Sequence, residues 1–222
     1  MSALRAVLFD WDGTLVDSAE TSFRCYVKLF ERYGIAFGRD EFERTYSPDW
    51  HRTYTALSLP REKWPEADAL WVEHYGREPS RLLPGVREAL ARLSEAGLAQ
   101  GIVSSGDGGR VRRELETHGL SALFSAVVCS GDTARRKPDP EPLLLALSRL
   151  QVRPEEAAYV GDSPEDVLMA RAAGVFVVGI PGGFPNGDAL RAAAPDVMAE
   201  GLEQATRELL ARIPDQASSN SR

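Results

Sequence analysis

The chain has 222 residues and a formal net charge of -7, with 43% hydrophobic and 27% charged residues. This size suits one core, or one core with a small added domain, and the composition is ordinary for a globular protein. The acidic balance argues against a nucleic-acid surface, because binding to a phosphate backbone needs concentrated Lys and Arg. No apolar run approaches the roughly 20 residues that span a bilayer, and the first strand pattern begins too early to leave room for a signal peptide. Cys25 and Cys129 lie in unrelated contexts, so we expect neither a disulfide framework nor a thiolate metal site, and we predict a cytoplasmic location.

The first predicted element is a strand over residues 6–9 that ends in paired acids. Asp10 and Asp12 follow this apolar run, and Gly13 permits an immediate turn. In extended backbone, residues two apart point to the same side, so both carboxylates can converge on one ligand. An isolated Asp-x-Asp-Gly is usually only an Asp-rich turn. Three later segments fit the same site, and they favour a catalytic or metal site over a turn.

Residues 17–82 show helical periodicity and no good strand pattern. Aromatic and apolar side chains recur there at helical spacing, and prolines and a glycine interrupt the run. The pattern predicts a helical domain that is inserted after the first strand. The chain re-enters the core at Pro84-Gly85.

Strand and helix patterns alternate over the rest of the chain. Strands are expected at residues 101–103, 125–129, 158–160 and 175–180, and helices at 86–96, 110–118, 141–150, 164–173 and 202–213. This alternation predicts an α/β fold with a doubly wound parallel sheet that is covered by helices on both faces. The expected core comprises residues 1–16 and 83–213 and the cap residues 17–82, while the polar, Ser-rich residues 214–222 are predicted to be disordered.

Three further polar segments follow predicted strands, where ligands of such sheets bind. They are Ser104-Ser105-Gly106, Lys137-Pro138-Asp139-Pro140 and Gly161-Asp162-Ser163-Pro164-Glu165-Asp166. Together with Asp10 and Asp12 they offer carboxylates, a hydroxyl and an ammonium. This set is suited to bind a phosphoryl dianion and a divalent metal and to supply a nucleophile. The chain has no G-x-x-x-x-G-K-[ST] sequence, so the phosphate site is not a P-loop.

In their order and spacing, these segments resemble the motifs of haloacid dehalogenase superfamily phosphotransferases. The resemblance rests on D-x-D-G-T-L-x-D-S, R-K-P-D-P and G-D-S-x-x-D, and it extends over nearly the whole chain. It implies a Rossmann-like core with an inserted helical C1 cap, as in the phosphoglycolate phosphatase and β-phosphoglucomutase subgroup. It also implies a magnesium-dependent phosphatase that acts on a small phosphorylated metabolite through an aspartyl-phosphate.

The resemblance and the chemistry of the side chains together suggest a role for each residue. Asp10 is the expected nucleophile, Asp12 the general acid/base, and Lys137 the cation that neutralises Asp10 and the phosphate. The expected magnesium ligands are Asp10, Asp12 and Asp162, and Asp166 is expected to support the metal through water or Lys137. The expected phosphate-binding positions are Trp11, Ser104, Ser105, Gly106 and Lys137.

Purely structural roles are an alternative for several of these residues. Ser105 or Asp107 is suited to cap the helix that follows, and Ser163 and Asp166 read as an N-cap with its capping acid. His118 reads as a helix C-terminal residue before a glycine. These structural roles are compatible with the functional ones.

Asp12 also bears on the choice among reactions. Dehalogenases and phosphonate-cleaving members lack an acid at this position, so its presence favours phosphoester chemistry. Mutases related to β-phosphoglucomutase carry a His at the position that matches Ser22, and this difference weakens the mutase hypothesis without excluding it. A phosphomutase is therefore the alternative, and a catalytically silent binding protein is the third hypothesis.

The cap is where the substrate would be selected. Trp50, His51 and Arg52 are the candidate specificity residues, although Ser47 and Pro48 would equally well begin a helix there. The expected partner is the small phosphorylated metabolite, with no nucleic acid and no membrane, and the expected state is a monomer or a weak homodimer.

Overall fold

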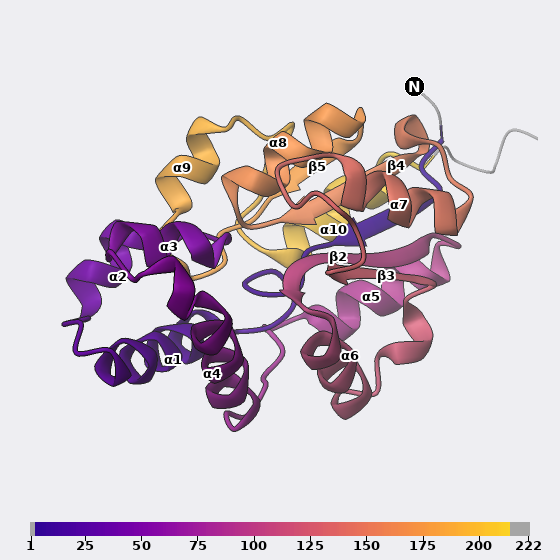
Figure 1. Ribbon diagram of the computed structural model, residues 1–222. Helices are drawn as coiled ribbons and strands as arrows, with labels where there is room; N and C mark the ends of the chain where they lie inside the picture. The colour runs from indigo at the N-terminus through magenta and orange to yellow at the C-terminus, as the bar shows by residue number, and fades with distance from the viewer. Residues whose placement is uncertain (1–2, 214–222) are drawn as a thin grey trace, which may run out of the picture.

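The computed structural model describes residues 3–213, so the predicted disordered tail, 214–222, lies outside the described residues. A six-stranded parallel sheet forms its centre, in the order β3-β2-β1-β4-β5-β6 (Figure 1). The strands are β1 (Ala6–Phe9), β2 (Ala99–Asp107), β3 (Ala126–Ser130), β4 (Ala157–Gly161), β5 (Phe176–Gly179) and β6 (Val197–Met198). The chain adds strands on one side of β1 and then on the other, so the switch point where ligands bind in such sheets lies beside β1. The predicted doubly wound parallel sheet is confirmed.

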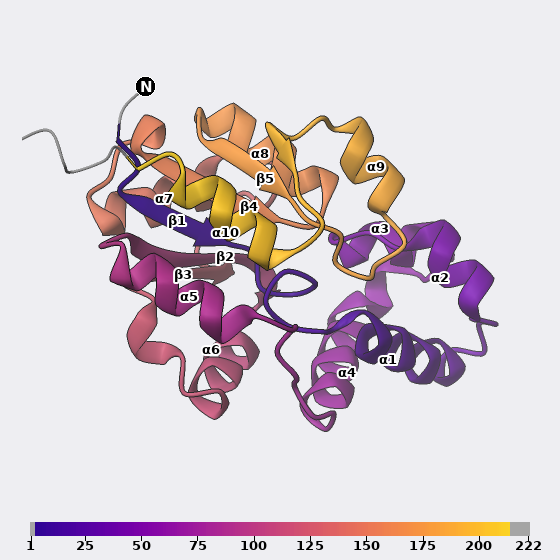
Figure 2. The ribbon, with the colours of Figure 1, turned by 180° about the vertical axis from the view of Figure 1, so that it is seen from behind.

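Helices cover both faces of this sheet. One face carries α5 (Val86–Glu95), α6 (Gly108–Thr117) and α10 (Leu202–Leu210), and the other carries α7 (Glu141–Leu150), α8 (Pro164–Ala173) and α9 (Gly187–Ala192). Figure 2 shows α5 and α10 in front of the sheet, whereas α7 and α8 lie in front in Figure 1. Val7 and Phe9 face the first set of helices, while Ala6 and Leu8 face the second. Because β1 is buried on both faces, its sequence is a continuous apolar run instead of an alternating one.

The remaining helices form a separate group beyond the carboxyl ends of the strands (Figure 1). They are α1 (Ala19–Arg32), α2 (Arg39–Thr45), α3 (Trp50–Ala56) and α4 (Trp64–Gly76), and we call them the cap. The cap has its own hydrophobic cluster, which is rich in aromatic side chains. Phe184, from the core loop after β5, joins this cluster and stacks on Tyr46 with the ring centroids 4.4 Å apart. Short 3-10 turns complete the structure at Arg61–Lys63, Ser121–Leu123 and Pro154–Glu156.

Two chain segments join the cap to the core, and they pair with each other. The amide of Asp17 donates to the carbonyl of Arg81, and the amide of Leu83 donates to the carbonyl of Leu15, both at 2.9 Å. Val16 and Leu82 form the antiparallel bridge between these bonds. We propose that the domain boundaries lie here, beside the segment that carries Asp10 and Asp12. Within residues 3–213, no helix is both long and apolar enough to cross a membrane.

Candidate active site

Three carboxylates meet at the carboxyl end of the central strands. Asp10 follows β1, Asp162 follows β4, and Asp166 lies in the first turn of α8; one carboxylate oxygen of each lies within 4.8 Å of the others. The Lys137 ammonium donates to Asp10 Oδ1 at 2.8 Å and to Asp166 Oδ1 at 2.7 Å. It also donates to the hydroxyl of Tyr159 at 2.7 Å. All five side chains are buried, so these charges act on one another with little screening by water.

The electrostatics of this cluster leave an excess of negative charge. Burial raises the pKa of Asp10 to about 7, even though the charge of Lys137 opposes the shift. Burial, followed by the charge of Asp10, raises the pKa of Asp162 well above its usual range. For Lys137, burial alone would lower the pKa, but the charges of Asp10 and Asp166 outweigh it and raise the pKa. One ammonium therefore does not balance the three acids.

A divalent cation fits this arrangement. Asp162 Oδ2 is buried and accepts no hydrogen bond from the described residues. A Cβ on Gly13 or Gly182 would lie 2.3 or 2.0 Å from this oxygen, so both positions need glycine for the carboxylate to be seated here. A buried set made only of oxygen ligands suits magnesium, which uses one or two carboxylates and keeps several waters. Asp10 and Asp162 would hold the ion, with Asp166 beside them.

Asp166 has a structural role as well as its place in the cluster. Ser163 is the N-cap of α8, and its hydroxyl accepts from the Asp166 amide at 3.2 Å. In return, Asp166 Oδ2 accepts from the amide of Ser163 at 3.1 Å, which completes a capping box. The predicted capping role is confirmed. Asp166 also contacts Lys137, and its support of a metal through water or Lys137 stays a prediction. The capping box thus holds Asp166 Oδ2 at the start of α8 and leaves Asp166 Oδ1 bonded to the Lys137 ammonium.

Asp12 lies outside the acidic cluster. Arg110 Nη1 donates to Asp12 Oδ1 at 3.1 Å, and Nη2 donates to Oδ2. The hydroxyl of Tyr75, from the cap, donates to Oδ1 at 3.3 Å. The structure therefore does not support the prediction that the Asp12 carboxylate is a metal ligand, because a guanidinium occupies both of its oxygens. Asp12 faces the same cavity as Asp10, which keeps a proton-transfer role open to it.

Arg110 is a site residue that the sequence analysis missed. Its side chain is only 2% exposed and also pairs with Glu114 at 3.1 Å. The Tyr75 ring covers the guanidinium, 4.4 Å from the ring centroid. Burial alone would lower the pKa of Arg110, but the charge of Asp12 outweighs it and the pKa is raised. The Arg110–Glu114 spacing of four residues is a signal of a helix pair, although such pairs are usually on the surface.

Trp11 is buried away from the cavity. Its indole nitrogen donates to Glu114 Oε2 at 2.6 Å, so the side chain supports the Arg110–Glu114 pair. A phosphate contact at the predicted position Trp11 can come only from the main chain. Ser104, Ser105 and Gly106 line the cavity, and their contacts with a phosphate stay a prediction.

The Ser104–Gly106 segment lies on the end of β2, which extends further than predicted through a register shift. The Ser104 hydroxyl accepts from the Gly106 amide at 3.0 Å. A Cβ on Gly106 would lie 2.2 Å from Arg110 Nη2, so a side chain here would displace the guanidinium. Asp107 caps α6 by accepting from the Arg110 amide at 2.8 Å, as predicted, and the N-terminus of α6 favours a nearby anion.

A cavity of about 650 Å³ lies between the core and the cap. Of the three predicted specificity residues, only Trp50 lines it. His51 stacks on Trp64, with the ring centroids 4.5 Å apart, and Arg52 is an exposed side chain 3.7 Å from Glu165. The prediction that His51 and Arg52 face the substrate is therefore not supported. The residue that caps α3 is Asp49, instead of the predicted Ser47.

The cavity also has lining residues that the sequence analysis did not identify; they include Tyr26, Tyr46, Tyr54, Asp68, Trp71, Arg136 and Phe184.

Comparisons with known proteins show what the chain is similar to. The model of the haloacid dehalogenase-like hydrolase family matches residues 7–180. Pyrophosphatase PpaX of Bacillus velezensis is 33% identical over 199 residues, which cover 88% of this chain and 91% of that protein. Phosphoglycolate phosphatase of Salmonella choleraesuis is 33% identical over 224 residues and covers 88% of each chain. The solved structure of a haloacid dehalogenase-like family hydrolase from Streptococcus pneumoniae is similar in fold, with a TM-score of 0.81 at 23% identity. The match covers 94% of this chain and 99% of that one.

Proposed function

Because the chain belongs to the haloacid dehalogenase-like hydrolase family, we propose that it is a magnesium-dependent phosphatase of a small phosphorylated metabolite, working through a phosphorylated Asp10. The observation that carries the proposal is the Lys137 ammonium bonded to both Asp10 and Asp166 at the switch point of the sheet. This contact fixes a carboxylate beside the cavity and keeps a cation next to it. The relatives named as a phosphoglycolate phosphatase and a pyrophosphatase support hydrolysis of phosphate compounds.

The reaction needs two displacements at phosphorus. In the first, the Asp10 carboxylate attacks phosphorus, the bond to the ester oxygen breaks, and Asp12 gives a proton to the leaving alkoxide. In the second, Asp12 takes a proton from water as the water oxygen attacks the phosphoryl group, which releases phosphate and restores the Asp10 carboxylate. Lys137 balances charge on Asp10 and the phosphoryl oxygens throughout. A bound magnesium ion would add positive charge at the same oxygens.

A phosphomutase would instead return the phosphoryl group to the substrate. Ser22, at the position where related mutases carry a His, is buried in the cavity wall. A serine hydroxyl does not take up a proton near neutral pH, so this wall lacks the base that the His would supply. We therefore favour transfer to water. A cytoplasmic location and a monomer or weak homodimer stay predictions.

The test is phosphate release from p-nitrophenyl phosphate and a metabolite panel, with magnesium or with a chelator. We expect release only with magnesium, and none from a folded Asp10→Asn variant, whose amide cannot act as the nucleophile. Asp139→Asn is the matched control, because Asp139 lies two residues after Lys137 in the same loop but accepts from the Glu141 amide at 2.9 Å, at the start of α7. Activity of Asp10→Asn near the wild-type level would refute the covalent mechanism. Interconversion of sugar phosphates without net phosphate release would favour the mutase.

A further inference from the structure

The cavity has two chemically different walls. All basic side chains that line it come from the core: Arg110, Lys137 and Arg136. The cap contributes none; among the described residues, its charged lining side chains are Asp68 and Glu73. A substrate with its phosphate at Asp10 therefore extends its leaving group toward a wall that carries carboxylates.

Two of the three basic side chains are already engaged near the phosphate. Arg110 holds Asp12 and Glu114, and Lys137 holds Asp10 and Asp166. The third, Arg136, is exposed at the cavity and lies over the Trp50 ring, 4.9 Å from its centroid. A second anionic group on the leaving group would thus meet no basic side chain from the cap, and the core cation left for it, Arg136, is exposed, so water screens its charge.

The cap wall is instead suited to a flat ring. Tyr26, Tyr54 and Trp71 line it, and Tyr26 and Trp71 are in contact, with their ring centroids 6.0 Å apart. Aromatic walls bind planar groups by offset or edge-to-face contact. The volume of about 650 Å³, which includes the phosphate site at Asp10, is in the usual range for small-molecule sites and leaves room for a ring beside the cap wall.

The same wall offers one donor and one acceptor side by side. The indole nitrogen of Trp71 is buried and has no acceptor among the described residues. Asp68 lies three residues earlier on α4, which puts both side chains on the same face of the helix. The Asp68 carboxylate accepts from Trp50 Nε1 at 2.8 Å and from His51 Nε2 at 3.2 Å. The Asp68 side chain is 34% exposed, so the carboxylate can accept a further hydrogen bond.

We infer that the substrate is the phosphate monoester of a planar heteroaromatic leaving group without a second negative charge. The edge of its ring meets Trp71, where an acceptor on that edge takes the indole N–H, and a donor on the same edge meets Asp68. This rests on the proposed phosphatase function and names its substrate class. It also separates this chain from the relatives, because glycolate and phosphate leaving groups are small and anionic.

The test compares esters of primary alcohols at saturating magnesium: 2-phosphoglycolate, propyl phosphate, 2-phenylethyl phosphate, pyridoxine 5′-phosphate and uridine 5′-monophosphate. We expect kcat/KM for the two heteroaromatic esters to exceed that for propyl phosphate and 2-phosphoglycolate by about tenfold or more, mainly through a lower KM. 2-Phenylethyl phosphate should fall between them, because it has the ring but not the polar edge.

Variants of the cap tryptophans connect this preference to the wall. Trp71→Leu should lower kcat/KM for the heteroaromatic esters more than for propyl phosphate and so remove most of their advantage, while Trp71→Phe should keep the part due to the ring. Trp64→Leu is the matched control, since Trp64 is on the same helix but does not line the cavity. Turnover of all the esters without a preference, or an equal change in Trp64→Leu, would overturn the inference alone. Absence of phosphate release from every ester, p-nitrophenyl phosphate included, would overturn the proposed function and this inference with it.

Discussion

Asp12 needs a defined position to deliver a proton to the leaving oxygen, and its position depends on Arg110. The guanidinium bonds to both Asp12 oxygens and is itself fixed by Glu114 and the Tyr75 ring. Arg110 is thus a positioning residue that acts through Asp12. Geometry of this kind matters because proton transfer requires hydrogen-bond distance to the reacting oxygen.

Arg110→Lys tests this role. Lysine keeps the charge but cannot bond to both carboxylate oxygens in one plane. We expect kcat/KM for alkyl phosphates to fall about tenfold or more, since general acid–base catalysis contributes roughly 10²–10⁴-fold. For p-nitrophenyl phosphate, whose leaving group needs no proton, the loss of kcat/KM should be much smaller, and Asp12→Asn should show the same contrast. The comparison uses kcat/KM because kcat also contains the attack of water, which Asp12 serves for every substrate.

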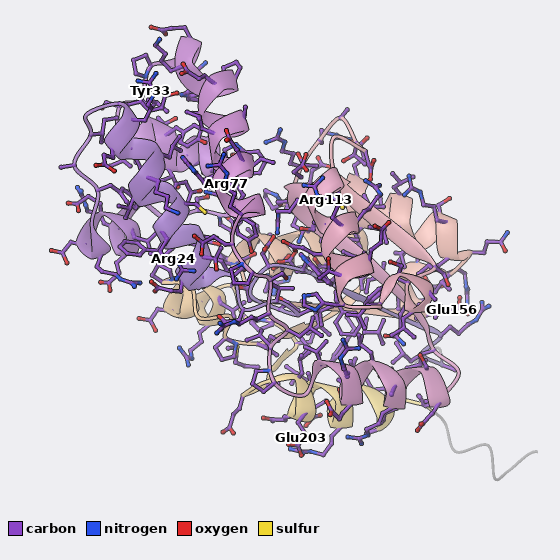
Figure 3. All side chains as sticks on the ribbon, turned by 90° about the horizontal axis from the view of Figure 1, so that it is seen from below. Arg24, Tyr33, Arg77, Arg113, Glu156 and Glu203 are labelled. Atoms are coloured by element: carbon purple, nitrogen blue, oxygen red, sulfur yellow. The ribbon has the colours of Figure 1, made fainter. Side chains whose placement is uncertain are left out.

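The matched control for Arg110→Lys is Arg113→Lys, on the exposed side of the same helix (Figure 3). That variant should keep both activities. Equal losses for alkyl and aryl phosphates in Arg110→Lys would show that the arginine does not act through leaving-group protonation.

At the scale of elements, the N-terminus of α8 contributes both to the stability of the helix and to the acidic cluster, because Asp166 takes part in both. Ser163→Ala removes the hydroxyl that caps the Asp166 amide and that also donates to Asp166 Oδ2 at 2.8 Å. We expect the free energy of unfolding in urea to fall by about 1–2 kcal/mol, the usual effect of losing an N-cap. Ser163→Thr should restore most of it, because the hydroxyl is kept. A loss of equal size in Ser163→Thr would point to packing instead of capping.

Elements with strong local signals could be predicted from the sequence, and short ones could not. The bounds of β1, α7 and α8 agree with the prediction, because a buried apolar run or a helix-starting proline marks each of them. β6 and α9 were not predicted, since two and six residues are too few for a periodic pattern.

The candidate site likewise contains residues that could be predicted from the sequence and residues that could not. Asp10, Lys137, Asp162 and Asp166 could be placed from their positions after strands, because parallel strands bring their carboxyl ends together. The Asp12–Arg110 pair and the cavity-facing side of α4 depend on how the cap packs on the core. Trp71 and Tyr75 recur at helical spacing, and such a pattern alone does not distinguish core packing from a cavity wall.

At the scale of the whole molecule, buried thiols and phenols should make the fold sensitive to alkali. Burial raises the pKa of Cys25 to about 12 and that of Cys129 to about 11, and it raises the pKa of Tyr26 and Tyr54. Above pH 9 the unfolded chain releases thiol protons that the folded protein retains, so the unfolded state binds fewer protons and stability falls as pH rises.

Each such group contributes at most about 1.4 kcal/mol per pH unit to this slope. Urea unfolding between pH 8 and about 11 measures it, within the window set by the thiol pKa values. Cys25→Ala and Cys129→Ala should each reduce the slope, whatever they do to stability at pH 7. A slope that is unchanged in both variants would mean that the thiols do not titrate differently on unfolding.

The cap and the core lie on opposite sides of the cavity, and we expect them to separate and close during turnover. The paired segments around Val16 and Leu82 connect the two parts, while Arg52 to Glu165, Tyr46 to Phe184 and Tyr75 to Asp12 join them across the cavity. Substrate must enter the cavity and phosphate must leave it, and closure would exclude bulk water from the Asp10 phosphoryl group.

Small-angle X-ray scattering with magnesium should therefore give a smaller radius of gyration with fluoroberyllate, a phosphate analogue, than without it. Arg52→Ala removes an ion pair outside the cavity, so it should enlarge the free protein, raise KM and leave the fluoroberyllate-bound dimensions close to wild type. Identical scattering in all these states would contradict cap movement, because every one of them would then share a single arrangement of cap and core.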